Sequence, residues 1–375
     1  MKVLIVLGTR PEVIKLAPVV EALRSHADVR VCASGQHQEM LQQALDAFAL
    51  QPDILLTTMS PGRSLNILAA RLLEALDAVL EAEQPDWVLV QGDTTTAFCA
   101  GLAAFHRQIK VGHVEAGLRT GDLASPFPEE ANRSLLARLA SLHFAPTEAA
   151  AKALVHEGIA ADRIHITGNT VVDAIRLAQQ GWAGVPPETL SESLCKILAQ
   201  DQLVLITCHR RENFGDVMEG LCAMISRLCL RYPAYNWIFP VHLNPAVREP
   251  VHRLLGHLPN LILIDPVDYQ TSLYLISRAS LIISDSGGIQ EEAPSFGTPV
   301  VVMRQHTERM EGVEAGFATL AGQDPARIEA AADAWLHDDA ARARLKQRAN
   351  PYGDGMASAR IAALLLGQAV EPFRG

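Results

Sequence analysis

Short apolar runs alternate with longer amphipathic stretches along almost the whole chain. Runs that are apolar throughout, separated by helical patterns, indicate parallel sheets covered by helices on both faces. Strands are expected at 2–7, 29–33, 87–91, 110–113, 142–144, 164–167, 203–207, 236–240, 261–264, 281–284 and 299–302. Helices are expected at 11–25, 38–48, 64–83, 95–106, 129–140, 170–179, 215–231, 245–256, 270–278, 287–296, 325–336 and 356–368.

This pattern restarts after Gly168-Asn169-Thr170, which indicates two domains. A chain of 375 residues also exceeds the usual size of one compact domain. The sequence therefore predicts an α/β protein with two Rossmann-like, doubly wound parallel-sheet domains, 1–168 and 169–355, that face a cleft. The segment 356–375 follows a Gly- and Pro-rich break and is expected to form a helix that packs back on the first domain.

Composition narrows the class of partner and the compartment. The net charge of −10 and the pI of about 5.7 argue against a nucleic-acid or anionic-membrane surface. No apolar run approaches roughly 18 residues, and the N-terminus lacks the design of a signal peptide. The six cysteines form no C-x-x-C pair, which favours reduced thiols over disulfides or zinc. A cytoplasmic protein is expected.

The most informative stretch begins where the apolar run 281–284 ends in Asp285-Ser286-Gly287-Gly288. A strand that turns here into a helix would present unpaired backbone N–H groups and a hydroxyl, and only glycine lets a phosphate approach the backbone closely. An ordinary tight turn explains the glycines equally well. Glu292 favours a nucleotide site, because a carboxylate one helical turn further on repels phosphate but suits a ribose diol.

Basic residues follow two other predicted strands. Arg10 and Lys15 flank a glycine-containing turn after the first strand, where two cations favour phosphate binding over ordinary surface charge. No G-x-G-x-x-G occurs there, which argues against an NAD-dependent dehydrogenase. His209 lies in a Cys-His-Arg-Arg segment, so it is suited to bind an anionic oxygen and to donate a proton to it. Arg309 is a further candidate after strand 299–302.

Carboxylates gather at the ends of neighbouring strands in the first half. Asp93 and Glu115 end two strands, and Glu129 opens the next helix. Each alone could simply cap a helix. Together they suit paired acid and base roles, because clustered carboxylates raise one another's pKa. None of these groups has the spacing of metal ligands, and no metal or cofactor is expected.

Five motifs occur in an order and spacing that closely resemble one enzyme family, the bacterial non-hydrolysing UDP-N-acetylglucosamine (UDP-GlcNAc) 2-epimerases. They are Gly8-Thr9-Arg10-Pro11-Glu12 with Lys15, Gln91-Gly92-Asp93-Thr94, His113-Val114-Glu115-Ala116-Gly117-Leu118-Arg119, Thr207-Cys208-His209-Arg210-Arg211-Glu212-Asn213 and Asp285-Ser286-Gly287-Gly288-Ile289-Gln290-Glu291-Glu292. Each motif alone is weak, but five in register are specific and cover nearly the whole chain.

The resemblance implies the glycosyltransferase-B architecture, a homodimer, and interconversion of UDP-GlcNAc and UDP-N-acetylmannosamine (UDP-ManNAc) for surface polysaccharide synthesis. The reaction would be anti elimination of UDP to 2-acetamidoglucal, followed by re-addition. The implied catalytic residues are Asp93, Glu115, Glu129 and His209. The implied substrate contacts are Arg10, Lys15, Asp93, Glu115, His209, Val267, Ser286, Gly287, Gly288, Glu292 and Arg309. A second, allosteric UDP-GlcNAc would contact Gln36, His37 and Arg63.

Some positions depart from the family pattern and leave alternatives open. Gln305 and Met310 replace an acid and a proline after the late strand, and Val267 and Ser272 stand where polar and aromatic side chains can occur. A 2-epimerase of a related UDP-sugar such as a diacetamido uronic acid, a hydrolysing epimerase, a glycosyltransferase of the same architecture and a non-catalytic UDP-sugar sensor remain the alternatives.

Overall fold

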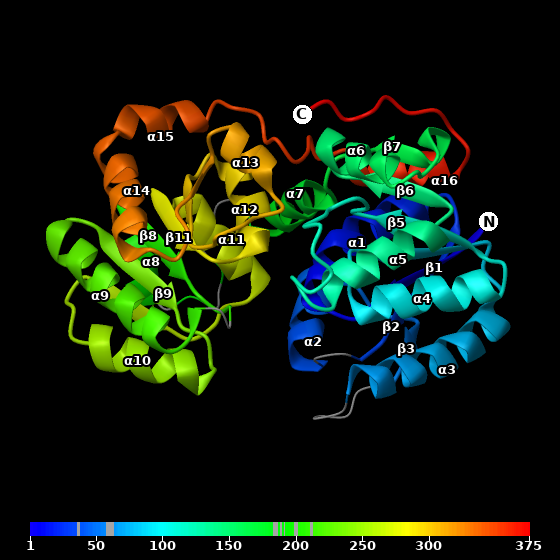
Figure 1. Ribbon diagram of the computed structural model, residues 1–375, viewed down its shortest axis with the longest axis horizontal. Coiled ribbons are helices and arrows are strands. Elements are labelled where there is room, and N and C mark those ends of the chain that lie inside the picture. The colour runs from blue at the N-terminus through cyan, green and yellow to red at the C-terminus, as the bar shows by residue number, and fades with distance from the viewer. Residues whose placement is uncertain are drawn as a thin grey trace. The chain divides into compact units, whose positions relative to one another are not determined.

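The computed structural model describes residues 1–35, 38–57, 64–182, 187, 190, 192–198, 202–210 and 213–375 (Figure 1). These residues form two compact units. The first unit comprises Met1–Gln180 and Tyr352–Gly375, and the second comprises Gly181–Pro351. Each unit is an α/β structure with its own sheet and its own apolar core.

The first unit contains a seven-stranded parallel sheet with the order β3-β2-β1-β4-β5-β6-β7. Its strands are β1 (Lys2–Leu7), β2 (Asp28–Ala33), β3 (Ile54–Leu55), β4 (Trp87–Gln91), β5 (Lys110–Val114), β6 (Leu142–Ala145) and β7 (Ile164–Ile166). Its helices are α1 (Arg10–Arg24), α2 (Gln38–Ala47), α3 (Leu65–Glu83), α4 (Thr95–His106), α5 (Glu129–Leu139), α6 (Glu148–His156), η1 (Ala161–Arg163), α7 (Thr170–Trp182) and α16 (Ala357–Leu365).

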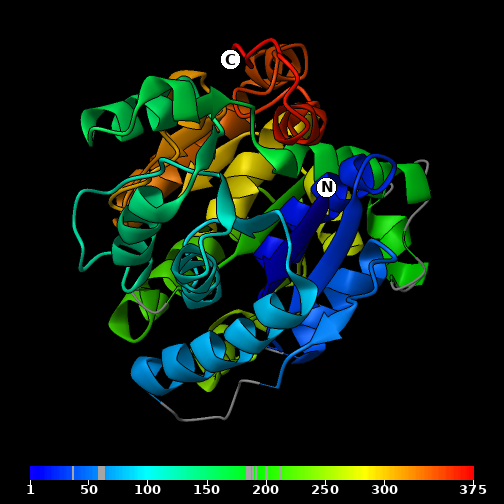
Figure 2. The same ribbon diagram turned by 90° about the vertical axis from the view of Figure 1, so that its right-hand side faces the viewer.

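Helices cover both faces of this sheet because successive strand residues point to opposite sides. In β1, Val3, Ile5 and Leu7 belong to the core cluster that includes α1, α2 and α16. Leu4 and Val6 belong instead to the cluster that includes α3 and α4, which lie side by side (Figure 2).

The second unit contains a six-stranded parallel sheet with the order β10-β9-β8-β11-β12-β13. Its strands are β8 (Leu203–Thr207), β9 (Asn236–Pro240), β10 (Leu261–Ile264), β11 (Leu281–Ser284), β12 (Val300–Val302) and β13 (Ala318–Leu320). Its helices are α8 (Glu192–Leu198), α9 (Asp216–Arg231), α10 (Pro245–Leu255), α11 (Tyr269–Arg278), α12 (Gly287–Glu292), η3 (Ala293–Phe296), α13 (Met310–Glu314), α14 (Pro325–His337) and α15 (Asp339–Leu345). Helices α9, α10 and α14 share one core cluster with the sheet.

The predicted fold class, two doubly wound parallel sheets in Rossmann-like units, is confirmed. The short strands β3 and β13 and the helices α6, α8, α13 and α15 were not expected. The expected helix 287–296 is divided into α12 and η3. Pro294 explains the division, since proline has no N–H to continue the α-helical hydrogen-bond pattern.

The division between the units differs from the expected boundary at 168/169. Helix α7 belongs to the first unit because it is held by the C-terminal segment of the chain. The Asp173 carboxylate accepts hydrogen bonds from the backbone N–H groups of Ala357 and Ser358, at 3.2 and 2.8 Å. Helix α16 in turn packs against α1 through Ile361, Ala362 and Leu365.

Among the described helices, none is long and apolar enough to cross a membrane.

The strand order of each sheet reverses at one place, between β1 and β4 in the first unit and between β8 and β11 in the second. Open parallel sheets bind ligands beyond the carboxyl ends of the strands at such a switch point. The motifs that begin at Gly8, Gln91, Thr207 and Asp285 all lie at the carboxyl ends of these four strands. The fold therefore places the chemically informative residues at two switch points.

Candidate active site

A buried ion pair lies at the carboxyl end of β5. Glu115 follows this strand with a φ of 62° and is 8% exposed. Its Oε1 pairs with the ammonium group of Lys15 from α1, and Gln91, the last residue of β4, donates to its Oε2. Asn169 donates to Oε1 over 3.4 Å. A buried ion pair persists only when such additional hydrogen bonds offset its lost hydration, so this cluster is a fixed part of the structure.

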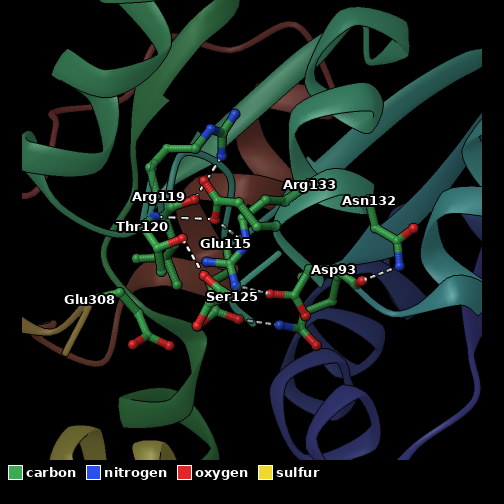
Figure 3. Close-up of polar contacts among 12 residues, drawn as sticks. Asp93, Glu115, Arg119, Thr120, Ser125, Asn132, Arg133 and Glu308 are labelled. Atoms are coloured by element: carbon green, nitrogen blue, oxygen red, sulfur yellow. Dashed lines mark hydrogen bonds and ion pairs between the residues drawn. The ribbon is translucent and has the colours of Figure 1, made fainter. Parts of the chain in front are cut away.

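Asp93, in the loop after β4, is held from the side of α5. Arg133 places Nη2 2.9 Å from Asp93 Oδ2, and Asn132 Nδ2 donates to the Asp93 backbone oxygen over 2.8 Å. Figure 3 shows both contacts. The Arg133 side chain is only 4% exposed, whereas that of Asp93 is 28% exposed. Asp93 is therefore fixed in orientation while it retains access to solvent.

The same arginine connects Asp93 to the loop before α5. Arg133 Nε lies 3.4 Å from Oε2 of the buried Glu130. The Glu130 carboxylate accepts the backbone N–H groups of Thr120 and Gly121, at 3.1 and 3.0 Å. Thr120 Oγ1 donates to Ser125 O over 2.6 Å across the loop, as Figure 3 shows. A continuous polar chain thus runs from the loop to Asp93.

Glu129 and Arg10 differ from these fixed groups. Both are half-buried, Glu129 as the first residue of α5 and Arg10 as the first residue of α1. Across the ranges that the structure describes, neither side chain has a hydrogen-bond or ion-pair partner. Each lies beyond the carboxyl end of its sheet and is available to a ligand there.

His113 is a support for the Asp93 loop. The residue is fully buried in β5, and its Nε2 lies 2.8 Å from the backbone oxygen of Gly92, which has a φ of 69°. Burial, reinforced by the nearby His143, lowers the pKa of His113 to about 3. The ring is therefore neutral near pH 7, and Nε2 donates its hydrogen to the Gly92 carbonyl.

In the second unit, His209 is oriented by a carboxylate. Its Nδ1 lies 3.0 Å from Oδ1 of Asp285, which follows β11 and has no exposed surface. Asp285 also accepts the backbone N–H groups of His209 and Arg210 and the side chain of Asn213, at 3.0, 2.9 and 2.8 Å. Burial by itself would raise the pKa of Asp285, but the hydrogen bond and charge of His209 and these backbone donors outweigh it and lower the pKa to about 2.

The neighbouring Ser-Gly-Gly turn is shaped around an arginine. Ser286 is the N-cap of α12, and a Cβ on Gly287 would lie 2.9 Å from the guanidinium carbon of Arg309, so a larger residue at this position would displace the guanidinium. Arg309 pairs with Glu291 and with Glu308, each at 2.7 Å. Next to the same turn, Glu292 Oε1 lies 3.7 Å from the position of a Cβ on Gly288. The turn thus gathers a hydroxyl, a paired guanidinium and a carboxylate.

Val267 lies in the loop between β10 and α11, just before the N-cap residue Asp268. Its side chain is half-buried. Within the described part of the chain, its backbone N–H and C=O form no hydrogen bonds. A donor and an acceptor are therefore available at one residue.

Gln36, His37 and Arg63, expected at a second ligand site, lie outside the described residues. Among the residues the structure does describe, no three His, Cys, Asp or Glu side chains converge to hold a metal ion. All six cysteines carry free thiols, five of them buried.

Sequence reasoning missed several residues that hold the site together. They are Glu12, Gln91, Glu130, Arg133, Asn169 and Asp285. Most stand within or beside the recognised motifs, but nothing in the sequence indicates which of two adjacent acids, Glu129 or Glu130, is turned inward. The only signal for Asp285 was its place directly between a strand and the Ser-Gly-Gly turn.

The comparisons with known proteins bear on this arrangement. Residues 21–366 match the family model described as UDP-N-acetylglucosamine 2-epimerase. A protein of Salmonella typhimurium named UDP-N-acetylglucosamine 2-epimerase is 48% identical over 367 residues, which are 96% of this chain and 97% of that protein. This chain belongs to the UDP-N-acetylglucosamine 2-epimerase family.

Solved structures of the family agree. The UDP-GlcNAc 2-epimerase of Neisseria meningitidis, in a crystal structure bound to UDP-GlcNAc, is 43% identical with a TM-score of 0.89, and the match covers 98% of this chain and all of that one. The Methanocaldococcus jannaschii enzyme, crystallised with UDP-GlcNAc and UDP, is 33% identical with a TM-score of 0.83 over 98% of this chain and all of that one.

Proposed function

We propose that this protein interconverts UDP-GlcNAc and UDP-ManNAc without hydrolysing either. The main support is the placement of Asp93, Glu115 and Glu129 after two neighbouring strands of one sheet, β4 and β5, and of His209 and the Ser286–Gly288 turn at the switch point of the other. The family members with UDP-GlcNAc bound support the choice of substrate. No nicotinamide is needed, because the proposed reaction proceeds by elimination and addition.

The first unit would perform the proton transfers. A carboxylate among Asp93, Glu115 and Glu129 removes the weakly acidic C2 proton while the bond between C1 and the UDP oxygen breaks on the opposite side, giving 2-acetamidoglucal and UDP. UDP then adds back to C1, and a proton is delivered to C2 on the other face. Arg10 and Lys15 supply positive charge, although Lys15 is already paired with Glu115.

The second unit would bind UDP and stabilise it as a leaving group. His209, with Nδ1 held by Asp285, presents Nε2 to a diphosphate oxygen, and the Ser286–Gly288 turn and Arg309 provide further donors. Glu292 suits the ribose diol. The free backbone N–H and C=O of Val267 match the acceptor and donor edge of uracil, which compensates for the missing polar side chain at this position.

The alternatives make different products. A hydrolysing epimerase would release free N-acetylmannosamine and UDP, and a glycosyltransferase would need an acceptor. A sensor would bind without turnover, but it would have no need of three carboxylates. A diacetamido uronic acid derivative would be handled by the same groups on a different sugar.

The decisive experiment is incubation of the purified protein with UDP-GlcNAc in deuterated water. Formation of UDP-ManNAc with deuterium at C2, and without net release of UDP, is the expected result. UDP-ManNAc without deuterium would contradict elimination and re-addition, and quantitative release of UDP with free sugar would identify a hydrolysing enzyme. A panel of UDP-sugars assayed in parallel identifies the preferred substrate.

The proposal also covers the oligomeric state of the enzyme, its regulation and its role in the cell. We propose a homodimer, a second UDP-GlcNAc that activates the enzyme, and a role in supplying ManNAc-type sugars for surface polysaccharides. Light scattering measures the first of these directly. A polysaccharide role predicts that disruption of the gene removes ManNAc-derived sugars from the cell surface.

A further inference from the structure

Glu12 is a fully buried carboxyl group in the first turn of α1. Acids in the first turn of a helix are common, but they normally face water, because a carboxylate without hydration is costly. Burial raises the pKa of Glu12 to about 7, against the effect of hydrogen bonds from Thr9 and Thr94. A group retained at such a cost needs a structural or functional reason.

Its contacts connect the two loops that flank the switch point of the first sheet. Glu12 Oε2 accepts the Gly8 backbone N–H at 3.0 Å and the Thr9 hydroxyl at 2.7 Å. Glu12 Oε1 accepts the Thr94 hydroxyl at 2.8 Å. Gly8 and Thr9 follow β1, whereas Thr94 follows β4 and caps α4. One side chain therefore joins two loops whose strands are adjacent in the sheet.

Each loop carries a residue of the proposed reaction. Arg10 directly follows Thr9, and Asp93 directly precedes Thr94. Asp93 is held on its other side by Arg133, but Arg10 has no side-chain partner among the described residues. The position of Arg10 relative to Asp93 consequently depends on the backbone of the turn that Glu12 secures.

A second contact shows how closely the loops fit. A Cβ on Gly8 would lie 2.4 Å from Ser34 Oγ and 2.6 Å from Thr96 Oγ1, and these hydroxyls are 3.1 Å apart. The turn after β1 thus already lies against the start of α4. The hydrogen bonds to Glu12 then fix the orientation of this turn.

We propose that Glu12 is a positioning residue that sets the separation of Arg10 from Asp93 by joining the Thr9 turn to Thr94. The inference rests on the proposed epimerase function, in which Arg10 supplies positive charge and Asp93 takes part in proton transfer. Glu12 itself touches neither reacting atom. Loss of Glu12 would misplace Arg10 relative to Asp93, and even small displacements of such groups lower the rate steeply.

The test compares variants that break the connection with variants that keep it. Glu12→Ala removes it and is expected to lower kcat on the order of 100-fold. Glu12→Gln can keep it, because its amide nitrogen can donate to the Thr94 hydroxyl while its oxygen still accepts from Gly8 and Thr9. We expect Glu12→Gln to lose less than about 10-fold. Thr94→Val should lower kcat about 10-fold with KM changed less than threefold, and Thr94→Ser should restore it.

Thr147→Val is the matched control. Thr147 lies in the same unit and caps α6, just as Thr94 caps α4. Its kcat should stay within about twofold, which separates the loss of a helix cap from the loss of the connection. If Glu12→Ala does not fold, the comparison of Thr94→Val with Thr94→Ser decides whether the inference holds. A folded Thr94→Val with kcat within twofold of the unmutated enzyme, or a Glu12→Gln as impaired as Glu12→Ala, would overturn the inference. An unmutated protein without epimerase activity would instead refute the proposed function.

Discussion

The imidazole Nδ1 of His209 lies 3.0 Å from Oδ1 of Asp285, a carboxylate that has no exposed surface. The two residues follow adjacent parallel strands, β8 and β11, so the sheet itself brings them together. Asp285 is fixed by hydrogen bonds from His209, Arg210 and Asn213, and it in turn fixes the ring. Among the residues that the structure describes, Nε2 of His209 has no partner, and it is the ring nitrogen available to a ligand.

Asp285→Asn is the variant that tests this relationship. Both carboxylate oxygens accept from N–H donors, so an amide NH2 in either orientation meets a donor. We expect kcat to fall at least ~10-fold and His209→Ala to lower it at least ~100-fold, with the double variant little worse than His209→Ala because the two act as a unit. Asp324→Asn, at the N-cap of α14, should leave kcat unchanged. Additive losses in steady-state kinetics would contradict a shared role.

Asp93→Asn should lower kcat at least ~100-fold without unfolding the protein, as expected for loss of a proton-transfer group. Exchange of deuterium into C2 should slow in parallel with epimerisation. Asp77→Asn, which changes an exposed ion pair with Arg107, is the control. Near-normal turnover of the Asp93 variant would remove this residue from the mechanism.

Stability should fall in mild acid because of two buried histidines. Burial lowers the pKa of His113 to about 3 and that of His143 to about 4, from an ordinary value of 6.5. Between roughly pH 6.5 and 4 the unfolded chain therefore binds protons that the folded protein does not, and the free energy of unfolding decreases by about 1.4 kcal/mol per pH unit for each group. Glu12 acts in the opposite direction. Its pKa is raised from 4.5 to about 7, so between these pH values the folded protein binds one proton that the unfolded chain does not.

His143→Phe measures the contribution of one of these groups. Neither ring nitrogen of His143 has a hydrogen-bond partner in the described structure, and its ring packs edge-on to His113. An apolar ring should remove an unpaired polar group and so raise stability by roughly 1–3 kcal/mol. It should also reduce the slope of the free energy of unfolding against pH, between pH 6.5 and 4, by an amount that corresponds to about one proton. Urea denaturation at several pH values provides the measurement. An unchanged slope would show that His143 is protonated in the folded state.

Gly117→Ala should destabilise the first unit strongly. Gly117 has a φ of 97°, and a Cβ there would lie 2.2 Å from the backbone oxygen of Ala150. Strain and collision together should cost at least about 2 kcal/mol, and Glu115, two residues earlier in the chain, should be displaced. Gly158, with a φ of 81° and open space for 4 Å around the place a Cβ would take, separates the two effects. Gly158→Ala should cost only about 1 kcal/mol in thermal unfolding.

Regulation by a second UDP-GlcNAc predicts a sigmoidal dependence of rate on UDP-GlcNAc and poor turnover of UDP-ManNAc alone, because one ligand prepares the site for the other. Arg63→Ala should make the curve hyperbolic while it spares the catalytic groups. The unmutated enzyme settles the question by itself: hyperbolic kinetics together with full activity on UDP-ManNAc alone would mean that no such site operates.

The long apolar strands and the residues at their ends could be predicted from the sequence, because alternation of strands and helices fixes which ends meet. The shortest elements could not. Strand β3 has two residues and β13 three, so their pairing depends on the neighbouring strand rather than on their own pattern. Residue types also leave side-chain direction open at loops and helix starts. Glu130 is buried and holds the loop at Thr120, whereas Glu129 beside it is half-exposed.

The place of α16 has a consequence for biosynthesis. Ile361, Ala362 and Leu365 complete the core around α1 and β1, yet they are synthesised only after the whole second unit. All of 181–351 must be synthesised in between, which takes roughly 10 to 30 s at ordinary translation rates. During that interval the newly made first unit exposes the apolar surface of α1 that α16 later covers. The unit translated first is thus the last to finish folding, and nascent chains of this protein should engage chaperones through that surface.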